Sequence, residues 1–437
     1  MNNYEPVIGI EVHVELNTKT KMFCRCSADY FGKEPNTHTC PICVGLPGAL
    51  PYINEEAINK CMQIGLALNC SVNEKSLFER KNYFYPDLPK GYQISQYRWP
   101  LCVSGWVEIE GREGSRRIRV NRVHQEEDTG KLTHMGNETL IDFNRSGVPL
   151  VEIVTEPDFR NSSEVKDYAK MLQQIFRHLG VSNADMERGD MRLEANVSVR
   201  PEGQKDLPPY RVELKNINSF RFMVAAIEYE IKRQIEALER GETLRQETRG
   251  WNEAKKESYL QRSKEEAHDY RYFPEPDLPE LRIKNLESRI KEEIKGKLPR
   301  EKAEYLVTTY KLSLPTVNTL IRQGTAPLFE EVMGIGKSQG IDAQGTANYI
   351  INRKIYPSTP SEQIVNDIQS KTINLISDES ELEKLARKAI EENPKAVEDY
   401  KKGKESAIQV LIGGVMRLSK GKADAGKVMG IMEKLLR

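Results

Sequence analysis

The 437-residue sequence lacks any apolar run near the roughly 20 residues that a membrane span needs, and its first residues lack the basic and apolar character of a secretory signal. We therefore expect a soluble cytoplasmic protein without a membrane partner. An excess of one charge is also missing, because Lys plus Arg and Asp plus Glu both number 65. The chain as a whole therefore does not indicate a nucleic-acid partner, and nothing in it points to DNA.

Three common motifs of nucleotide and hydrolase chemistry are missing or lack their required context. The segment 336–338 resembles the end of a phosphate-binding loop, but the glycine that this loop requires would be at position 331, where the chain has Glu331. No G-x-G-x-x-G motif opens a strand-to-helix turn, and the G-x-S-x-G match at 336–340 lies in a helical stretch and does not follow a strand. These observations argue against a P-loop enzyme, a dinucleotide-binding fold and a nucleophile-elbow hydrolase.

What the chain does have is a first predicted strand, 7–16, with two chemically different faces. Apolar residues alternate there with Glu11, His13 and Glu15, and successive side chains of a strand point to opposite faces. Neighbours on the polar face are roughly 7 Å apart, close enough to converge on one hydrated cation or phosphate. A half-exposed sheet with a solvated face produces the same alternation, so this strand alone leaves both interpretations open.

Carboxylates recur on one face of further predicted strands. Glu152 and Glu156 share a face within 150–157, as Glu194 and Asn196 do within 193–200. This pattern favours an antiparallel sheet whose polar face lines a cavity. Hard oxygen ligands with few imidazoles suit Mg²⁺ or Mn²⁺, and such sites usually hold the phosphates of a nucleotide. The residues that fit a phosphoryl-transfer site are Glu11, His13, the run 124–128, Glu152 and Glu194.

Four of the seven cysteines have the spacing of a metal site. A C-x-C pair and a C-x-x-C pair, separated by thirteen residues, are formed by Cys24, Cys26, Cys40 and Cys43. Four thiolates leave no open position, so we predict a structural Zn²⁺; two disulfides or four ordinary buried thiols are the alternatives. Cys61, Cys70 and Cys102 fit no such spacing, and we interpret them as small apolar residues. An odd number of cysteines and a zinc site agree with a reducing cytoplasm.

The segment 80–96 combines basic and amide side chains with four tyrosine or phenylalanine rings. Such a segment could stack a base and hold a phosphate, or it could be an aromatic turn packed on the sheet. Beyond the charged run 288–297 the pattern is almost purely helical, so the chain as a whole is predicted to be α+β. The last 44 residues carry ten basic against five acidic side chains, which also suits a solvated helical face.

Several long motifs, taken in order, resemble the B subunit of the tRNA-dependent glutamyl/aspartyl amidotransferases, the three-subunit GatCAB enzymes. These motifs occupy 7–16, 80–96, 124–131, 149–158, 213–220 and 269–277. The resemblance covers nearly the whole chain, and a series of unusual motifs is more specific than one short pattern. It implies an antiparallel catalytic cradle similar to glutamine synthetase over 1–295, a helical domain over 296–365, and a helical, YqeY-like tail over 366–437 that binds tRNA.

The resemblance also implies a reaction and its partners. ATP would phosphorylate the side-chain carboxylate of Glu carried by tRNA(Gln), or of Asp carried by tRNA(Asn), and ammonia would displace the phosphate. The amidase, or A, subunit of the same complex would supply the ammonia from glutamine, and the small C subunit would join the other two. Two rivals stay open: a non-catalytic zinc-containing RNA-binding module, and a metal-dependent phosphoesterase.

Residue roles follow from the same resemblance. It implies His13, Glu127 and Glu152 as Mg²⁺ ligands, with Glu11 nearby, and Lys215 as a cation for phosphate, although a surface ion pair is its other interpretation. The expected nucleotide contacts are Asn82, Tyr83, Lys90, Glu126, Glu194 and Asn196. The cofactors implied are ATP, Mg²⁺ and structural Zn²⁺. One departure concerns Glu194, which is one methylene longer than the family's usual aspartate; a second is an unusually short stretch over 357–378.

Overall fold

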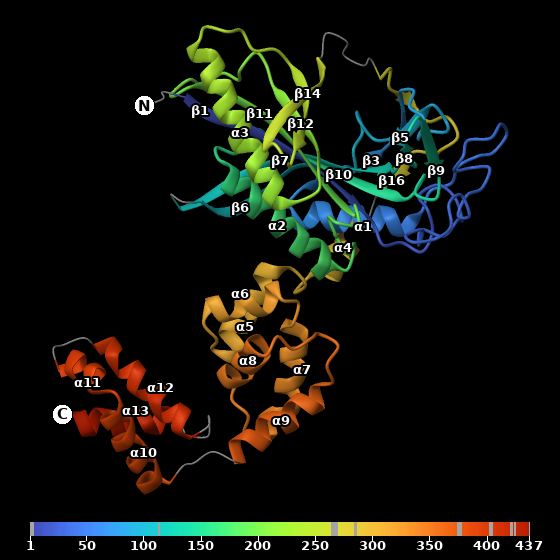
Figure 1. The fold of residues 1–437 in the computed structure, drawn as a ribbon. Helices are drawn as coiled ribbons and strands as arrows, with labels where there is room; N and C mark the ends of the chain where they lie inside the picture. The colour runs from blue at the N-terminus through green and yellow to red at the C-terminus, as the bar shows by residue number, and fades with distance from the viewer. Residues whose placement is uncertain are drawn as a thin grey trace. The chain divides into compact units, whose positions relative to one another are not determined.

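The computed structural model of the protein describes residues 4–111, 114–263, 270–283, 286–373, 378–401, 405–419, 423 and 425–436. The chain divides into two compact units, Met1–Lys302 and Ala303–Arg437 (Figure 1). No helix among the described residues is long and apolar enough to cross a membrane.

A nine-stranded sheet forms the framework of the first unit, in the order β14-β13-β12-β11-β1-β10-β7-β6-β2. Neighbouring strands run antiparallel except β12 and β13, which are parallel. The strands are β1 (Tyr4–Glu15), β2 (Ser71–Val72), β6 (Cys102–Gly111), β7 (Gly114–Glu127), β10 (Pro149–Thr155), β11 (Met191–Pro201), β12 (Val212–Ile217), β13 (Glu247–Asn252) and β14 (Glu257–Ser263). The predicted α+β class is confirmed.

Three helices cover the apolar face of this sheet: α1 (Glu55–Ala67), α2 (Ser162–Leu179) and α3 (Phe220–Glu239) (Figure 1). Ile8, Ile10 and Val12 of β1 are buried in the core cluster that these helices share with the sheet. Asn54, Asn161 and Ser219 cap the helices by accepting hydrogen bonds from backbone N–H groups of the first turn, which are otherwise without partners. Because the helices take one face, the polar side chains of β1 are left on the other.

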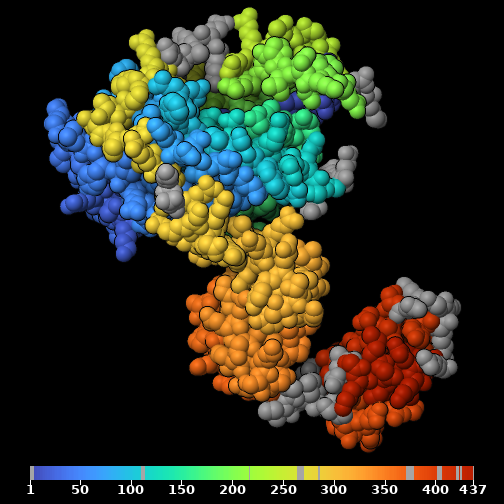
Figure 2. Space-filling model, turned by 180° about the vertical axis from the view of Figure 1, so that it is seen from behind, coloured from blue at the N-terminus to red at the C-terminus, as the bar shows by residue number. Residues whose placement is uncertain are grey.

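Short strands near one end of the large sheet make three smaller sheets. Their strands are β3 (Lys75–Ser76), β4 (Glu79–Asn82), β5 (Tyr92–Ser95), β8 (Lys131–Met135), β9 (Glu138–Asp142), β15 (Phe273–Pro274) and β16 (Leu281–Arg282). Residues just after 270 pair with residues 75–82, and Figure 2 shows this yellow segment lying against the blue one. A double hydrogen bond from Arg80 to the buried Glu275 joins the two segments. Asp269, which begins the last family motif, lies outside the described residues.

The charged run 288–297 forms most of α4 (Leu286–Ile294), whose Ile290 and Ile294 are buried in the core of the first unit. The elements of the second unit, over its described residues, are all helices. Its helices are α5 (Pro299–Tyr310), which begins in the first unit, α6 (Leu314–Arg322), α7 (Ala326–Gly336), α8 (Ala343–Asn352), α9 (Ser361–Ile373), α10 (Glu379–Glu392), α11 (Pro394–Lys401), α12 (Ile408–Leu418) and α13 (Ala425–Leu436).

Three apolar clusters lie within this helical unit, one of them formed by residues between Ala303 and Ile350. Ile364 and Val365 of α9 pack against Leu328 and Val332 of α7. A separate cluster lies wholly within residues 382–436. The division into domains at 295/296 and 365/366 stays a prediction.

Candidate active site

The register of the large sheet brings polar side chains from four strands to one face. His13 of β1 lies opposite Glu152 of β10, and Glu152 in turn lies opposite His124 of β7. On the other side of β1, Glu11 is opposite Glu194 of β11. Residues that face each other in antiparallel strands project to the same side, so these side chains converge although they are far apart in the chain.

One group of possible metal ligands consists of His13, Glu126 and Glu152, each of which has a ligand atom within 4.8 Å of the others. The Nε2 atom of His13 is 3.8 Å from Oε2 of Glu152. His124 lies between the two carboxylates, with Nε2 at 3.1 Å from Glu152 and 3.3 Å from Glu126. Lys81 of β4 places Nζ 3.9 Å from Oε1 of Glu126.

Neighbouring basic side chains keep the two carboxylates of this group ionised despite their burial. Burial alone disfavours the charged form of Glu126, but Lys81 and then His124 lower its pKa to about 2. Burial opposes ionisation of Glu152 as well, yet His124 and His13 hold its pKa well below the usual value. For His124, burial is outweighed by Glu152 and Glu126, which raise the pKa of the imidazole. Two carboxylates are therefore available as anionic ligands at neutral pH.

A second acidic group adjoins the first. It consists of Glu11, Glu194 and Glu213, again with ligand atoms within 4.8 Å of one another. Lys215 binds two of these residues, with Nζ at 2.8 Å from Glu194 and 3.3 Å from Glu213. Burial, then Glu152 and Glu194, raises the pKa of Glu11. Carboxylate oxygens without sulfur ligands suit a hard divalent cation, which would relieve the repulsion around Glu11.

Glu127, which the sequence analysis named as a Mg²⁺ ligand, does not join either group. Its carboxylate pairs with Lys90 and accepts a hydrogen bond of 2.9 Å from the backbone N–H of Ile94. It lines a cavity of about 230 Å³ beside Cys43 and Gly147. Because side chains alternate along β7, Glu126 rather than Glu127 shares the face of His124.

The predicted nucleotide contacts lie in different places. Glu126 belongs to the first acidic group and Glu194 to the second, and Asn196 donates a hydrogen bond of 2.9 Å to Glu11. The amide of Asn82 instead donates to the backbone carbonyls of Tyr270 and Arg271. Tyr83 packs edge-on against Tyr270, and Lys90 is paired with Glu127. The segment 80–96 thus contains both a contact to the acidic site and an aromatic packing region.

A cavity of about 420 Å³ lies beside the second acidic group. Strands β1, β7, β10 and β11, the segment 207–211 and Gln246 line it, and Glu11 and Asn196 are on its wall. Arg122 also lines this cavity, with its guanidinium 5.6 Å from the ring centre of Tyr97. Among the described residues no carboxylate comes within 4.0 Å of the Arg122 guanidinium, and its buried Nε has no hydrogen-bond partner there. An open cavity with an uncompensated cation on one wall and acidic groups on another suits a metal-bound polyphosphate.

Three members of the site, Lys81, Arg122 and Glu213, were not predicted from the sequence. Lys81 and Arg122 had no signal of their own, because only the tertiary fold brings Lys81 of β4 to Glu126 and Arg122 of β7 to the wall of the cavity. Parity along the chain could have distinguished Glu126 from Glu127, since Glu126 is two residues from His124.

The four predicted zinc ligands come together near Glu127 and Gly147. The Sγ atoms of Cys24, Cys26, Cys40 and Cys43 lie within 4.8 Å of one another. Cys40 and Cys43 are 3.9 Å apart at sulfur, and zinc–sulfur bonds of about 2.3 Å in a tetrahedron require about 3.8 Å. All seven cysteines are free thiols, so the disulfide alternative is wrong, and Cys61, Cys70 and Cys102 are buried in the core as expected. The donor set therefore fits a closed structural metal site.

Comparison with known proteins agrees with this fold and site. Residues 6–288 match the family model described as the GatB/GatE catalytic domain, and residues 344–436 match the one described as the GatB domain. A sheet with acidic groups on one face, four clustered cysteines and a helical second unit thus define a catalytic subunit of the GatB/GatE class.

Individual relatives narrow this class. The B subunit of the aspartyl/glutamyl-tRNA(Asn/Gln) amidotransferase of Thermotoga maritima is 42% identical over 483 aligned positions that cover 99% of each chain. A protein of the same name from Caldanaerobacter subterraneus subsp. tengcongensis is 45% identical over 466 positions, covering 96% of this chain and 97% of the relative. The chain belongs to the family of aspartyl/glutamyl-tRNA amidotransferase B subunits.

Proposed function

We propose that this protein is the kinase and transamidase component of a glutamine-hydrolysing aminoacyl-tRNA amidotransferase. In this role it uses ATP to phosphorylate the side-chain carboxylate of Glu-tRNA(Gln), of Asp-tRNA(Asn), or of both, and then amidates the activated carboxylate with ammonia. The observation that carries the proposal is the convergence of His13, Glu126 and Glu152 beside Glu11, Glu194 and Glu213 on one face of the sheet. The relatives named above are similar over nearly their full length, which supports the same reaction here.

The first acidic group holds Mg²⁺ in this proposal, through His13, Glu126 and Glu152. The second group, with Glu11, is the place for a further divalent cation. Mg²⁺, when bound, screens the repulsion between ATP and the substrate carboxylate and orients the phosphate to be transferred. His124 hydrogen-bonds both Glu126 and Glu152 and so orients them toward His13.

The cavity beside Glu11 is the proposed nucleotide pocket. Arg122 is placed on its wall to bind a phosphate oxygen, because it is a fixed cation without a carboxylate partner among the described residues. Lys215 neutralises part of the second acidic group and limits its net negative charge. Asn196 fixes the orientation of Glu11 through its hydrogen bond.

The remaining parts supply assembly and substrate capture in this proposal. The cysteine cluster holds structural Zn²⁺ and stiffens the loop that packs beside Glu127. In a heterotrimer, the amidase (the A subunit) delivers ammonia, the small C subunit joins the amidase to this chain, and the C-terminal helices of this chain bind the misacylated tRNA. The setting is the reducing cytoplasm, where free cysteines persist.

Co-expression of this chain with candidate A and C subunits tests the proposal. We expect the purified complex to form Gln-tRNA from Glu-tRNA(Gln), or Asn-tRNA from Asp-tRNA(Asn), only when glutamine, ATP and Mg²⁺ are all present. A stable complex that makes no product from either verified charged tRNA would contradict the proposal. Phosphate-ester cleavage without glutamine or aminoacyl-tRNA would instead favour a metal-dependent phosphoesterase.

A further inference from the structure

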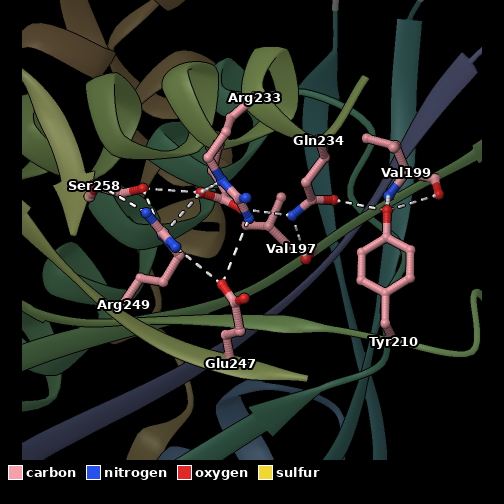
Figure 3. Close-up of polar contacts among 9 residues, drawn as sticks. Val197, Val199, Tyr210, Arg233, Gln234, Glu247, Arg249 and Ser258 are labelled. Carbon is pink, nitrogen blue, oxygen red and sulfur yellow. Dashed lines mark hydrogen bonds and ion pairs between the residues drawn. The ribbon is translucent and has the colours of Figure 1, made fainter. Parts of the chain in front are cut away.

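A buried polar network lies between α3 and the sheet (Figure 3), and it contacts β11 and Tyr210, which also line the proposed nucleotide pocket. Its centre is the fully buried carboxylate of Glu230. This carboxylate accepts hydrogen bonds from Arg233 at 2.6 Å, from Gln234 at 2.9 Å and from Ser258 at 3.0 Å. A buried charge is unfavourable unless it is paired and hydrogen-bonded, so these contacts favour one arrangement of the network.

Gln234 connects the network to two walls of the pocket. Its Nε2 donates to the backbone carbonyl of Val197 at 3.1 Å, in the part of β11 where Asn196 and Ser198 line the pocket. Its Oε1 accepts a hydrogen bond of 3.0 Å from the hydroxyl of Tyr210. Tyr210 lies in the segment 207–211, which forms another wall.

The Tyr210 hydroxyl also joins these two walls directly. It lies 3.3 Å from both the backbone nitrogen and the backbone oxygen of Val199 in β11 (Figure 3). One hydroxyl therefore couples the segment 207–211 to β11 and, through Gln234, to α3. The same side chain takes no part in either acidic group.

The network also contacts strand β13. Arg249 binds Ser258 at 2.8 Å and Glu247 at 3.0 Å, and it lies 3.6 Å from Glu230 (Figure 3). Thr248, between these two network residues, donates a hydrogen bond of 2.9 Å to Glu213 of the second acidic group. The network thus supports both the walls of the pocket and one member of that acidic group.

We propose that Tyr210 and Gln234 are positioning residues for nucleotide binding: they fix the segment 207–211 against β11 so that the pocket beside Glu11 keeps its shape. The inference rests on the proposed function, because it takes the nucleoside triphosphate as the occupant of that pocket. Neither residue touches the two acidic groups, and the hydroxyl of Tyr210 and the amide of Gln234 bond only to β11, α3 and each other among the described residues, so these polar groups act on the nucleotide through the shape of the walls. Supporting residues of this kind change affinity by about tenfold or more when they are lost.

The test compares Tyr210→Phe with Tyr168→Phe in the full-length chain. Each substitution removes one hydroxyl from a buried ring, but the Tyr168 hydroxyl has no hydrogen-bond partner among the described residues. Calorimetric titration with Mg·ATP should give a Kd about tenfold higher for Tyr210→Phe and an unchanged Kd for Tyr168→Phe. The melting temperature without nucleotide, measured in parallel, separates a loss of pocket shape from a loss of stability.

Gln234→Leu extends the test to the second residue. We expect it to raise the Kd for Mg·ATP as Tyr210→Phe does. The fold-increase in Kd of the double variant should be smaller than the product of the two single fold-increases, because both substitutions break the same contact. In the amidation assay the KM for ATP should rise while kcat at saturating ATP stays within about twofold.

Three outcomes would overturn the inference. If wild-type protein binds Mg·ATP and Arg122→Gln weakens binding, but Tyr210→Phe and Gln234→Leu do not, only the positioning role falls. A lower melting temperature with unchanged Kd in both variants would assign Tyr210 and Gln234 a purely structural role. If the wild-type chain does not bind Mg·ATP at all, the proposed nucleotide pocket and the inference fall together.

Discussion

Glu126 and Glu127 are neighbours in the chain, but their carboxylates lie on opposite sides of β7. Glu126 accepts hydrogen bonds from Ser95 at 2.6 Å and Gln93 at 3.2 Å and belongs to the group with His13 and Glu152. Glu127 is paired with Lys90 beside the cysteine loop. Two residues of the same charge and almost the same place in the sequence therefore have different surroundings.

This difference makes the two residues a matched pair for testing the metal site. We expect Glu126→Gln to weaken Mg²⁺ or Mn²⁺ binding by more than about tenfold, because it removes an anionic oxygen ligand. Glu127→Gln should leave the affinity for these ions within about twofold. Calorimetric titration of each full-length variant with Mn²⁺ measures the effect, and equal affinities in the two variants would contradict the assignment of Glu126.

Arg122 offers a test of the nucleotide pocket. We expect Arg122→Gln to raise the KM for ATP by about tenfold or more, since a charge-assisted hydrogen bond to phosphate is lost from a confined site. Arg117→Gln is the control, because Arg117 is exposed and its guanidinium carbon lies 3.9 Å from the ring centre of Trp106. Neither Arg117 nor Trp106 is on the wall of the pocket. A similar KM for both variants would mean that the nucleotide does not contact Arg122.

The sequence predicts the site residues of β1 better than those of β7, and the reason is geometric. The two-residue period of a strand places Glu11 and His13 on one face of β1 without knowledge of any neighbour, and the structure confirms that shared face. Parity separates Glu126 from Glu127, but choosing between them also requires knowing which alternate residues of β7 share a face of the sheet with Glu152. The pairing of Glu152 with His124 puts His124, and with it Glu126, on that face.

Contributions from the smaller sheets could not be predicted in this way. Lys81 reaches Glu126 only because β4 pairs with β5, which contacts β7, and no local pattern determines that arrangement. Cysteine spacing was sufficient to predict that Cys24, Cys26, Cys40 and Cys43 cluster, because four sulfurs in two short pairs have few ways to come together. The cavity beside Arg122 depends on elements distant in the chain, so it has no sequence signal.

The cysteine cluster gives a prediction about metal content and stability. We expect Cys40→Ser to lose bound zinc and to lower the free energy of unfolding by several kcal/mol, because zinc binding to a four-thiolate site is coupled to folding. Cys61→Ala is the control: it shortens a fully buried core side chain and should reduce stability while keeping the zinc. Elemental analysis and denaturant unfolding measure the two effects. Full stability of the wild type after chelation would argue against the zinc site.

An ion pair at the end of β10 predicts a pH dependence of stability. Arg119 binds Asp158 through its backbone N–H at 2.9 Å and its guanidinium at 2.9 and 2.6 Å. Burial acts against ionisation, but these hydrogen bonds lower the pKa of Asp158. Since the folded pKa lies below the unfolded one, the stabilisation is present above the ordinary pKa near 4 and is lost as the pH falls through the folded value.

We therefore expect Asp158→Asn to destabilise the protein by about 1 kcal/mol at pH 7, and the difference from wild type to fade below about pH 4. Urea unfolding at a series of pH values measures this difference. Asp29→Asn is the control, because Asp29 is largely exposed and its pair with Lys33 at 3.5 Å should contribute little. If Asp158→Asn lowers the free energy of unfolding by the same amount at pH 7 and at pH 3.5, the stabilisation does not come from the charged interaction.

The C-terminal helices give the last prediction, which concerns tRNA. Their apolar core, which includes Leu382 and Leu436, is contained within residues 382–436, so removing residues 378–437 does not cut through the neighbouring clusters. We expect this truncation to weaken tRNA binding by about tenfold or more, a loss of about 1.4 kcal/mol of binding free energy for each factor of ten. ATP hydrolysis in the absence of tRNA should be unchanged. The acidic groups that would bind Mg²⁺ all lie before residue 214, which is why the two activities should separate.

A milder variant separates charge from loss of the whole segment. Lys384 and Lys388 are exposed on α10, and replacing both with alanine should weaken tRNA binding and reduce its salt dependence, because fewer counterions are released from the phosphates. Glu391→Ala removes an exposed acidic residue from the same helix and should not weaken binding. Unaltered tRNA affinity in both the truncated chain and the lysine variant would assign tRNA capture to another part of the protein, with the catalytic proposal unaffected.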